Sequence, residues 1–361
     1  MKTSCQYPYF AIVYNWARIT IFLIICFTVP ILHAVEHPDI WPTTGWQASN
    51  SEDHGINSSI FNEIYANESF TGNLLLVRHG FLVSERYDQE QGKRFAPPIF
   101  SCTKGIISAL IGIALHRGHL TSIQQSVLAF FPEYELSNYD KRKQKMTLYH
   151  LLTMTSGLRW NEGFSQYMLI YRQPDWCKYI LDKPMADTPG TRFNYNSANA
   201  HLLSAILQIA TRMNTLGYAE LYLFKPLGIH IVEWEQTPRG IYLGGWGMRM
   251  TLEDMAKFGY LYLQEGRWEG KQVIPTDWIK ASTQQHVEES GDFAGWGYGY
   301  LWSAPPDMPY VVNTLIGGDG QHTCMITVIP DLDIVFVYAG LTNHEEMLLL
   351  MKKYLFPAVK F

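Results

Sequence analysis

Ser101 and Lys104 are the residues of this 361-residue chain whose types and spacing most directly predict chemistry. Three positions are nearly one helical turn, so a helix places both side chains on one face, within contact distance. Burial of that face disfavours the ammonium form, which lowers the pKa of Lys104 and lets the neutral amine take the Ser101 proton. Backbone N–H groups at the start of the helix would stabilise an oxyanion. The alternative is a helix-capping serine followed by a surface lysine.

The residues after the pair favour a buried position for Lys104. Positions 105–116 are apolar on nearly every face, which predicts a helix that runs through the core and starts at Ser101. A solvated lysine would be out of place at the start of such a helix. Cys102 lies about 100° round the helix from Ser101 and is expected to be a small buried side chain, not a second nucleophile.

Tyr195 is the candidate for the third group, because a serine–lysine pair needs a residue that passes protons to the leaving group. It lies in the segment 193–199, between a Pro189-Gly190 turn and an apolar helix expected over 201–210. A tyrosine near a helix start also packs in a core, and this alternative stays open.

The strand patterns come from both ends of the chain. Residues 73–87 form two β-prone runs around His79-Gly80, which predicts a hairpin. The middle of the chain alternates helical patterns with proline and glycine breaks. The late elements expected are strands over 295–302, 325–329 and 334–338 and a final helix over 345–354.

This order predicts an α+β fold, in which an antiparallel sheet flanked by helices is built from both chain ends and carries a mostly helical inserted domain. An extended lead-in is expected before the sheet. The predicted division is a lead-in over 35–69, an α/β sheet domain over 70–120 and 286–361, and a mostly helical region over 121–285.

The N-terminus has the pattern of an export signal. Residues 19–32 are an uncharged apolar run that follows Lys2 and Arg18 and precedes a small residue, Ala34. The run is shorter than the roughly 20 apolar residues of a spanning helix. We therefore predict a signal peptide over 1–34 and a periplasmic or secreted protein, with a membrane anchor over residues 19–33 as the alternative.

Composition excludes several classes of protein. Lys and Arg number 28 and Asp and Glu 33, a balance of 28 − 33 = −5 that predicts no nucleic-acid partner. Hydrophobic residues make up 47% and charged residues 17%, so most of the chain is expected to fold around a large core. The cysteine and histidine spacings match no zinc pattern, and neither a metal nor a cofactor is predicted.

The ordered set of motifs resembles the serine β-lactamase and D,D-peptidase-like hydrolases, in particular the class C-like branch with its esterases and 6-aminohexanoate-oligomer hydrolases. The resemblance covers residues 72–358, nearly all of the predicted exported chain. Besides the Ser101–Lys104 pair, it rests on the segments 150–158, 189–195, 245–251 and 317–321.

This resemblance implies roles for individual residues. Ser101 would be the acylated nucleophile, Lys104 its base partner, and Tyr195 the proton shuttle. Ser197 takes the third position of the family's Y-x-N motif, where Asn is usual, and would contact the substrate or Lys104. The oxyanion hole would consist of the backbone N–H groups of Ser101 and Gln321, and Gly320 would complete the predicted substrate-binding set.

The resemblance also implies the charge of the substrate. Relatives that bind a substrate carboxylate have Lys or His where this chain has Gly318, and the next residue here is Asp319. Loss of the cation and an acid beside its position disfavour a carboxylate. The predicted partner is therefore a small uncharged ester or amide. The alternatives are β-lactamase or D,D-carboxypeptidase activity, and a catalytically idle envelope binding protein on the same scaffold.

Overall fold

The computed structural model describes residues 41–88, 90 and 92–360. The predicted signal peptide or anchor, together with the first residues of the lead-in, lies outside this part of the chain. Within the described residues, no helix combines the length and the apolar character that crossing a bilayer requires.

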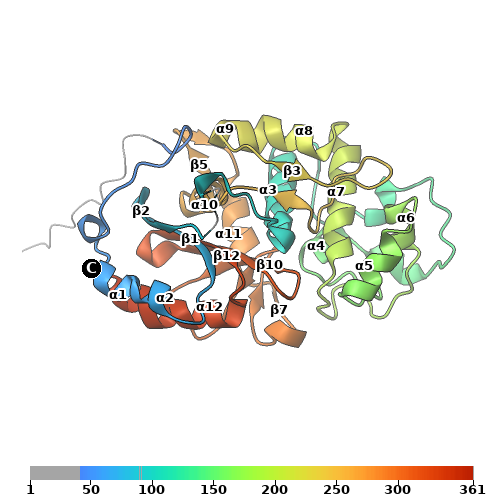
Figure 1. Ribbon diagram of the computed structural model, residues 1–361. Helices are drawn as coiled ribbons and strands as arrows, with labels where there is room; N and C mark the ends of the chain where they lie inside the picture. The colour runs from blue at the N-terminus through green and yellow to red at the C-terminus, as the bar shows by residue number, and fades with distance from the viewer. Residues whose placement is uncertain (1–40, 89, 91, 361) are drawn as a thin grey trace, which may run out of the picture. The chain divides into compact units, whose positions relative to one another are not determined.

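An eight-stranded sheet organises the fold, and its neighbouring strands run antiparallel (Figure 1). The order β2-β1-β12-β11-β10-β9-β8-β7 puts the first hairpin beside the last strand of the chain. The predicted α+β class, with a sheet built from both chain ends, is therefore confirmed. The strands are β1 Gly72–Arg78, β2 Phe81–Arg86, β7 Val287–Glu288, β8 Gly297–Tyr298, β9 Ser303–Ala304, β10 Asn313–Gly318, β11 Thr323–Ile329 and β12 Ile334–Gly340.

The β1–β2 hairpin turns at the predicted dipeptide. Arg78 pairs with Phe81, and the two residues between them, His79 and Gly80, have φ angles of 53° and 79°. Positive φ at both central residues is what a two-residue type I′ turn requires, and this turn matches the twist of the strands it joins. The turn chemistry alone was thus sufficient to predict the start of the sheet.

Helices cover both faces of the sheet. Alternate side chains of a strand point to opposite faces, and on β1 Leu75 and Val77 enter one core cluster while Leu74 and Leu76 enter another. The first cluster includes the helix that follows Ser101, and the second includes the last helices of the chain. Figure 1 shows α3 and α10 on one side of the sheet and α12 on the other.

The helices differ in length and position. Those longer than ten residues are α3 Thr103–His116, α7 Ser197–Thr211 and α10 Leu252–Leu263. The shorter ones are α1 Ser58–Phe61, α2 Glu63–Ala66, α4 Leu148–Leu152, α5 Phe164–Ile170, α6 Trp176–Leu181, α8 Thr215–Ala219, α9 Lys225–Leu227, α11 Thr276–Thr283, α12 His344–Leu350 and α13 Phe356–Ala358. Two separate strand pairs are β3 Glu233–Trp234 with β4 Met248–Arg249, and β5 Arg267–Trp268 with β6 Lys271–Gln272.

Helix α10 packs directly on the centre of the sheet, because it has a glycine at the crossing point. A Cβ atom on Gly259 would lie 2.6 Å from Val335 Cγ1 and 3.1 Å from Ile326 Cγ2. Val335 lies on β12 and Ile326 on β11. A larger residue would force the helix away from both strands.

Strand β10 was not predicted. Its last two residues, Gly317 and Gly318, are turn-forming types, which weaken the strand pattern at this end. In the structure these glycines end a strand, and the turn follows at residues 319–322. The predicted strand over 295–302 was also too long: it contains only the two residues of β8 and turns at Leu301, which has a φ of 65°.

Candidate active site

Ser101 lies in a short 3₁₀ turn, Phe100–Cys102, that leads into α3. Phe100 has a φ of 46°, in the left-handed region that bulky residues rarely adopt. Such a conformation costs on the order of 1–2 kcal/mol, so the surrounding structure must hold it. Part of that support is the Ile99 N–H, which donates to Met248 O at 2.9 Å. The predicted helix start is therefore a strained turn, and the α-helix proper begins two residues later.

The end of β10 passes directly beside Ser101. A Cβ atom on Gly317 would lie 2.4 Å from Ser101 N and 2.8 Å from Ile99 O, closer than any real contact. The neighbouring Cys102 is fully buried, and its Sγ lies 3.4 Å from Leu315 O on the same strand. Backbone thus packs against backbone here, and only glycine at position 317 permits the approach.

Lys104 is buried and contacts the serine. Its side chain is 1% exposed, and Nζ donates to Ser101 Oγ at 2.7 Å and to Gly245 O at 2.9 Å. Burial lowers the pKa of Lys104 to about 8, an effect that the negative charge of Glu162 partly opposes. The structure thus brings together the two residues that the sequence singled out first, and it gives Lys104 an accessible neutral form near physiological pH.

Tyr195 completes the group. Lys104 Nζ lies 4.8 Å from the centroid of the Tyr195 ring. Burial raises the pKa of Tyr195 well above its usual value; the charge of Glu162 raises it further and the Ser101 hydroxyl lowers it. The side chain is therefore a neutral phenol at physiological pH, able to donate a proton.

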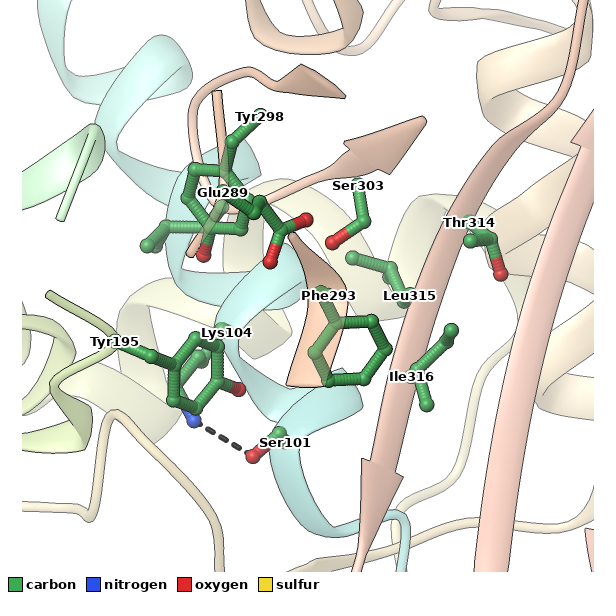
Figure 2. A pocket seen from close by; sticks show the side chains of 11 residues that line it. Ser101, Lys104, Tyr195, Glu289, Phe293, Tyr298, Ser303, Thr314, Leu315 and Ile316 are labelled. Atoms are coloured by element: carbon green, nitrogen blue, oxygen red, sulfur yellow. Dashed lines mark hydrogen bonds between the residues drawn. The ribbon is translucent and has the colours of Figure 1, made fainter. Parts of the chain in front are cut away.

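These three side chains line one cavity, which Figure 2 shows from close by. Ser101, Lys104 and Tyr195 gather on one side of the view, and residues of β10 form the wall on another. The remaining lining residues are Glu289, Phe293, Tyr298, Leu301, Ser303, Thr314, Leu315 and Ile316.

Ser197 does not contact Lys104. Its backbone N–H donates to Glu162 Oε2 at 3.0 Å, and its hydroxyl donates to Glu162 Oε1. Trp160 Nε1 donates to the same carboxylate at 2.6 Å, and so does the Tyr167 hydroxyl. The structure therefore does not show the Lys104 alternative of the predicted contact, and Ser197 binds a carboxylate that the sequence analysis missed. Glu162 lies 35 positions before Ser197, and no local pattern marks it.

Gln321 and Gly320 also differ from the prediction. The Gln321 N–H donates to Asp319 Oδ1 at 2.9 Å, so it is engaged within its own turn and not free to bind an oxyanion. Neither Gly320 nor Gln321 is among the described residues that line the cavity. The reason is the unpredicted strand: β10 continues to Gly318, and the residues of this strand that line the cavity are Thr314, Leu315 and Ile316.

Glu289 is a second carboxyl group that the sequence analysis missed. It follows β7, is 3% exposed and lines the cavity together with Ser101. Burial raises the pKa of Glu289 to about 8, and the Ser303 hydroxyl opposes the shift. In sequence it is one acid in the run Glu288-Glu289, which is typical of a solvated surface.

Together, the antiparallel sheet, the serine at the start of a buried helix and the lysine one turn later define the class of serine hydrolases that includes β-lactamases and penicillin-binding proteins. The family model described as Beta-lactamase matches residues 73–354. The chain belongs to this family.

Solved structures with low sequence identity share the fold. The "Putative 6-aminohexanoate-dimer hydrolase" from Bacillus anthracis aligns with a TM-score of 0.69 at 19% identity and covers 87% of each chain. The octameric penicillin-binding protein homologue from Pyrococcus abyssi has a TM-score of 0.65 at 18% identity, over 84% of this chain and 78% of that one. The D-stereospecific amidohydrolase from Streptomyces sp. has a TM-score of 0.64 at 15% identity, over 84% and 98%.

Proposed function

We propose that this protein is a serine hydrolase that forms an acyl-enzyme at Ser101 from an ester or amide carrying no carboxylate. The observation that carries the proposal is the contact between Ser101 Oγ and Lys104 Nζ, 2.7 Å apart, with the lysine almost completely buried. Burial favours the neutral amine, and a neutral amine in contact with a hydroxyl is a base for its proton.

Acylation requires two proton movements. Ser101 Oγ forms a bond to the substrate carbonyl carbon, and its proton passes to Lys104 Nζ. The bond from that carbon to the alcohol or amine then breaks, and Tyr195 supplies the proton that the leaving group takes up. The lysine proton replaces the one that the phenol gave, so Lys104 and Tyr195 return to their neutral forms.

Deacylation uses the same residues in reverse. Water attacks the acyl carbon and gives one proton to the Tyr195–Lys104 pair. The ester bond to Ser101 Oγ breaks, and that proton returns to the serine. The products are the free acid and regenerated enzyme, so no cofactor is needed for the atoms to balance.

Two backbone N–H groups are suited to the oxyanion: those of Ser101 and Gly318. The Asp319 N–H donates to His322 O at 3.3 Å on the β11 side. Because backbone groups alternate along an antiparallel strand, the N–H of Gly318 faces the opposite edge. A Cβ atom on the adjoining Gly317 would lie 2.4 Å from Ser101 N, so this end of the strand lies beside the nucleophile. Gly318 therefore replaces Gln321 in the proposed oxyanion hole.

The lining of the cavity disfavours a substrate carboxylate. The β10 residues that line it are Thr314, Leu315 and Ile316, none of which carries a charge. The charge of Glu162 is negative and raises the pKa of Tyr195. A substrate carboxylate would be repelled by this charge, and the uncharged β10 wall offers it no ion pair.

The decisive experiment is intact-mass analysis after treatment with a fluorophosphonate, with a Ser101→Ala variant alongside. The expected result is one adduct on the wild type and none on the variant, together with hydrolysis of p-nitrophenyl butyrate that the variant loses. Covalent labelling of Ser101 by a fluorescent penicillin at a comparable rate would support β-lactamase or D,D-carboxypeptidase activity instead. Absence of both adducts on folded protein would support an idle binding protein.

A further inference from the structure

Glu162 lies in the loop between α4 and α5 and accepts four hydrogen bonds. Trp160 Nε1 donates to its Oε2 at 2.6 Å, and the Ser197 N–H donates to the same oxygen at 3.0 Å. The hydroxyls of Tyr167 and Ser197 donate to Oε1. An ionised carboxyl group only accepts hydrogen bonds, so this set of donors on both oxygens fixes the place and the orientation of the Glu162 side chain.

One of these donors, Ser197, connects Glu162 to the segment that carries Tyr195. Ser197 is the first residue of α7 and is fully buried, and Tyr195 lies two positions before it. Ser197 binds both carboxylate oxygens, one through its N–H and the other through its hydroxyl. Two contacts from one residue restrict the movement of its backbone and of the residues just before it.

The residue on the other side of Tyr195 contacts the same loop. Asn194 Nδ2 donates to Trp160 O at 3.1 Å, and the Asn194 N–H donates to Met154 O at 2.9 Å. The indole of Trp160 in turn binds Glu162. The loop therefore holds the chain both before and after Tyr195, and the carboxylate of Glu162 connects the two contacts.

The position of the Tyr195 phenol decides whether it can pass on a proton. A general acid must lie within hydrogen-bond reach of the leaving atom, and a displacement of about 1 Å can lower the rate about 100-fold. The centroid of the Tyr195 ring lies 4.8 Å from Lys104 Nζ, the group that returns the proton in the proposed mechanism. Burial raises the pKa of Tyr195 and the charge of Glu162 raises it further, so the proton stays on the phenol until the leaving group takes it.

We propose that Glu162 is a positioning residue: by binding Ser197, it holds Tyr195 where the phenol can protonate the leaving group. This inference rests on the proposed hydrolase function and deepens it. Glu162 is not among the described residues that line the cavity, so it acts through Ser197 and Tyr195 and not on the substrate itself. Its loss should therefore impair protonation of the leaving group more than the attack by Ser101.

The test compares two butyrate esters that differ in their leaving group. p-Nitrophenolate leaves without a proton, whereas ethoxide leaves only with one, and both esters form the same acyl-enzyme. We expect Glu162→Ala to lower kcat/KM for ethyl butyrate at least about tenfold more than kcat/KM for p-nitrophenyl butyrate. A smaller fraction of folded protein would lower both values equally, so the ratio of the two reports on Tyr195 and not on stability.

The matched control is Asp182→Ala, because Asp182 binds a serine in the same way. The Ser137 N–H donates to Asp182 Oδ1 at 2.6 Å, and the Ser137 hydroxyl donates to Oδ2 at 3.4 Å. Neither residue is among the described residues that line the cavity, so this variant should keep the wild-type ratio. An equal fall of the ratio in Asp182→Ala and Glu162→Ala would overturn the inference.

A double variant shows whether Glu162 acts through Tyr195. Tyr195→Phe should itself lower the ratio of ethyl to p-nitrophenyl butyrate at least about tenfold, and adding Glu162→Ala to it should change the ratio less than about twofold. A wild-type ratio in Glu162→Ala, or a further fall of about tenfold in the double variant, would overturn the inference while leaving the hydrolase function intact.

Hydrogen exchange separates the inference from the proposed function, because it requires no substrate. Without its acceptor, the Ser197 N–H should exchange at least about tenfold faster in Glu162→Ala, measured by mass spectrometry on peptides that cover residues 193–199. The rate should be unchanged in Asp182→Ala. Failure of both esters with this acceleration present would refute the hydrolase and keep the contact, whereas an unchanged exchange rate in Glu162→Ala would refute the contact. If Glu162→Ala does not fold, Glu162→Gln takes its place with the same directions expected, because an amide cannot accept from all four donors.

Discussion

The acid limb of the pH–rate profile is the sharpest test of the proposed base. The pKa of Lys104 is lowered from its usual 10.5 to about 8 because the side chain is buried. At pH 7 about one molecule in ten then has a neutral Lys104, against roughly one in 3,000 at the usual pKa. Burial therefore raises the population of the active base about 300-fold, equivalent to roughly 3 kcal/mol.

The assay is kcat/KM for p-nitrophenyl butyrate between pH 6 and 9.5, because this parameter reports the ionisation of the free enzyme. We expect a tenfold rise per pH unit up to about pH 8 and a plateau above it. The sign follows from the chemistry: protonation removes the base, so activity is lost as the pH falls.

Glu289 titrates in the same range, because burial raises its pKa to about 8 as well. The profile is therefore repeated with Glu289→Gln, in which the acid limb should stay near pH 8. A flat profile, or a limb that disappears in Glu289→Gln, refutes the assignment to Lys104.

Three further predictions follow from the packing. Gly317→Ala should lower kcat/KM at least about 100-fold, since the new methyl group collides with Ser101 N. In Gly118→Ala the methyl group enters open space and the φ of 76° strains the backbone only at that turn, so kcat/KM should be unchanged; an equal loss in both variants would contradict the packing argument. Glu162→Gln should lower the free energy of unfolding, measured in urea, by about 2–3 kcal/mol, since an amide cannot accept hydrogen bonds from all four donors. An unchanged unfolding midpoint would show that these donors find other partners. As the pH rises from 4.5 to 8, the free energy of unfolding should fall by at most on the order of 5 kcal/mol through Glu289, because in this range the folded state binds one more proton than the unfolded state. This dependence on pH should be weaker in Glu289→Gln, and an unchanged dependence would refute the contribution.

The contacts predicted correctly are those between residues that are close in sequence. Ser101 and Lys104 are three positions apart, so helix geometry alone places them in contact, and the apolar run after them predicts the burial. The hairpin at His79-Gly80 is equally local, because turn chemistry decides it. Tyr195 was chosen because the pair needs a third group and this residue lies between a turn and an apolar helix, and the structure puts its ring beside Lys104.

The contacts that the sequence missed depend on the pairing of distant segments. Gln321 was assigned to the oxyanion hole by the resemblance. The end of β10 at Gly318 is set by pairing with β11, which local propensity does not record. Ser197 was expected to contact the substrate or Lys104, and the structure pairs it with Glu162, 35 positions away.

The sequence by itself determined the class of chemistry. A hydroxyl and an amine one helical turn apart lie in contact once the helix forms, and both are shielded from water if the helix is apolar on every face. Only the tertiary structure decided which carboxyl groups surround them. Glu162 and Glu289 come from separate loops, and a side chain on a loop has no periodicity that predicts its burial. The electrostatic surroundings of Ser101 and Lys104 are therefore a property of the folded chain, because electrostatic interactions depend on distance and burial and not on order in the sequence.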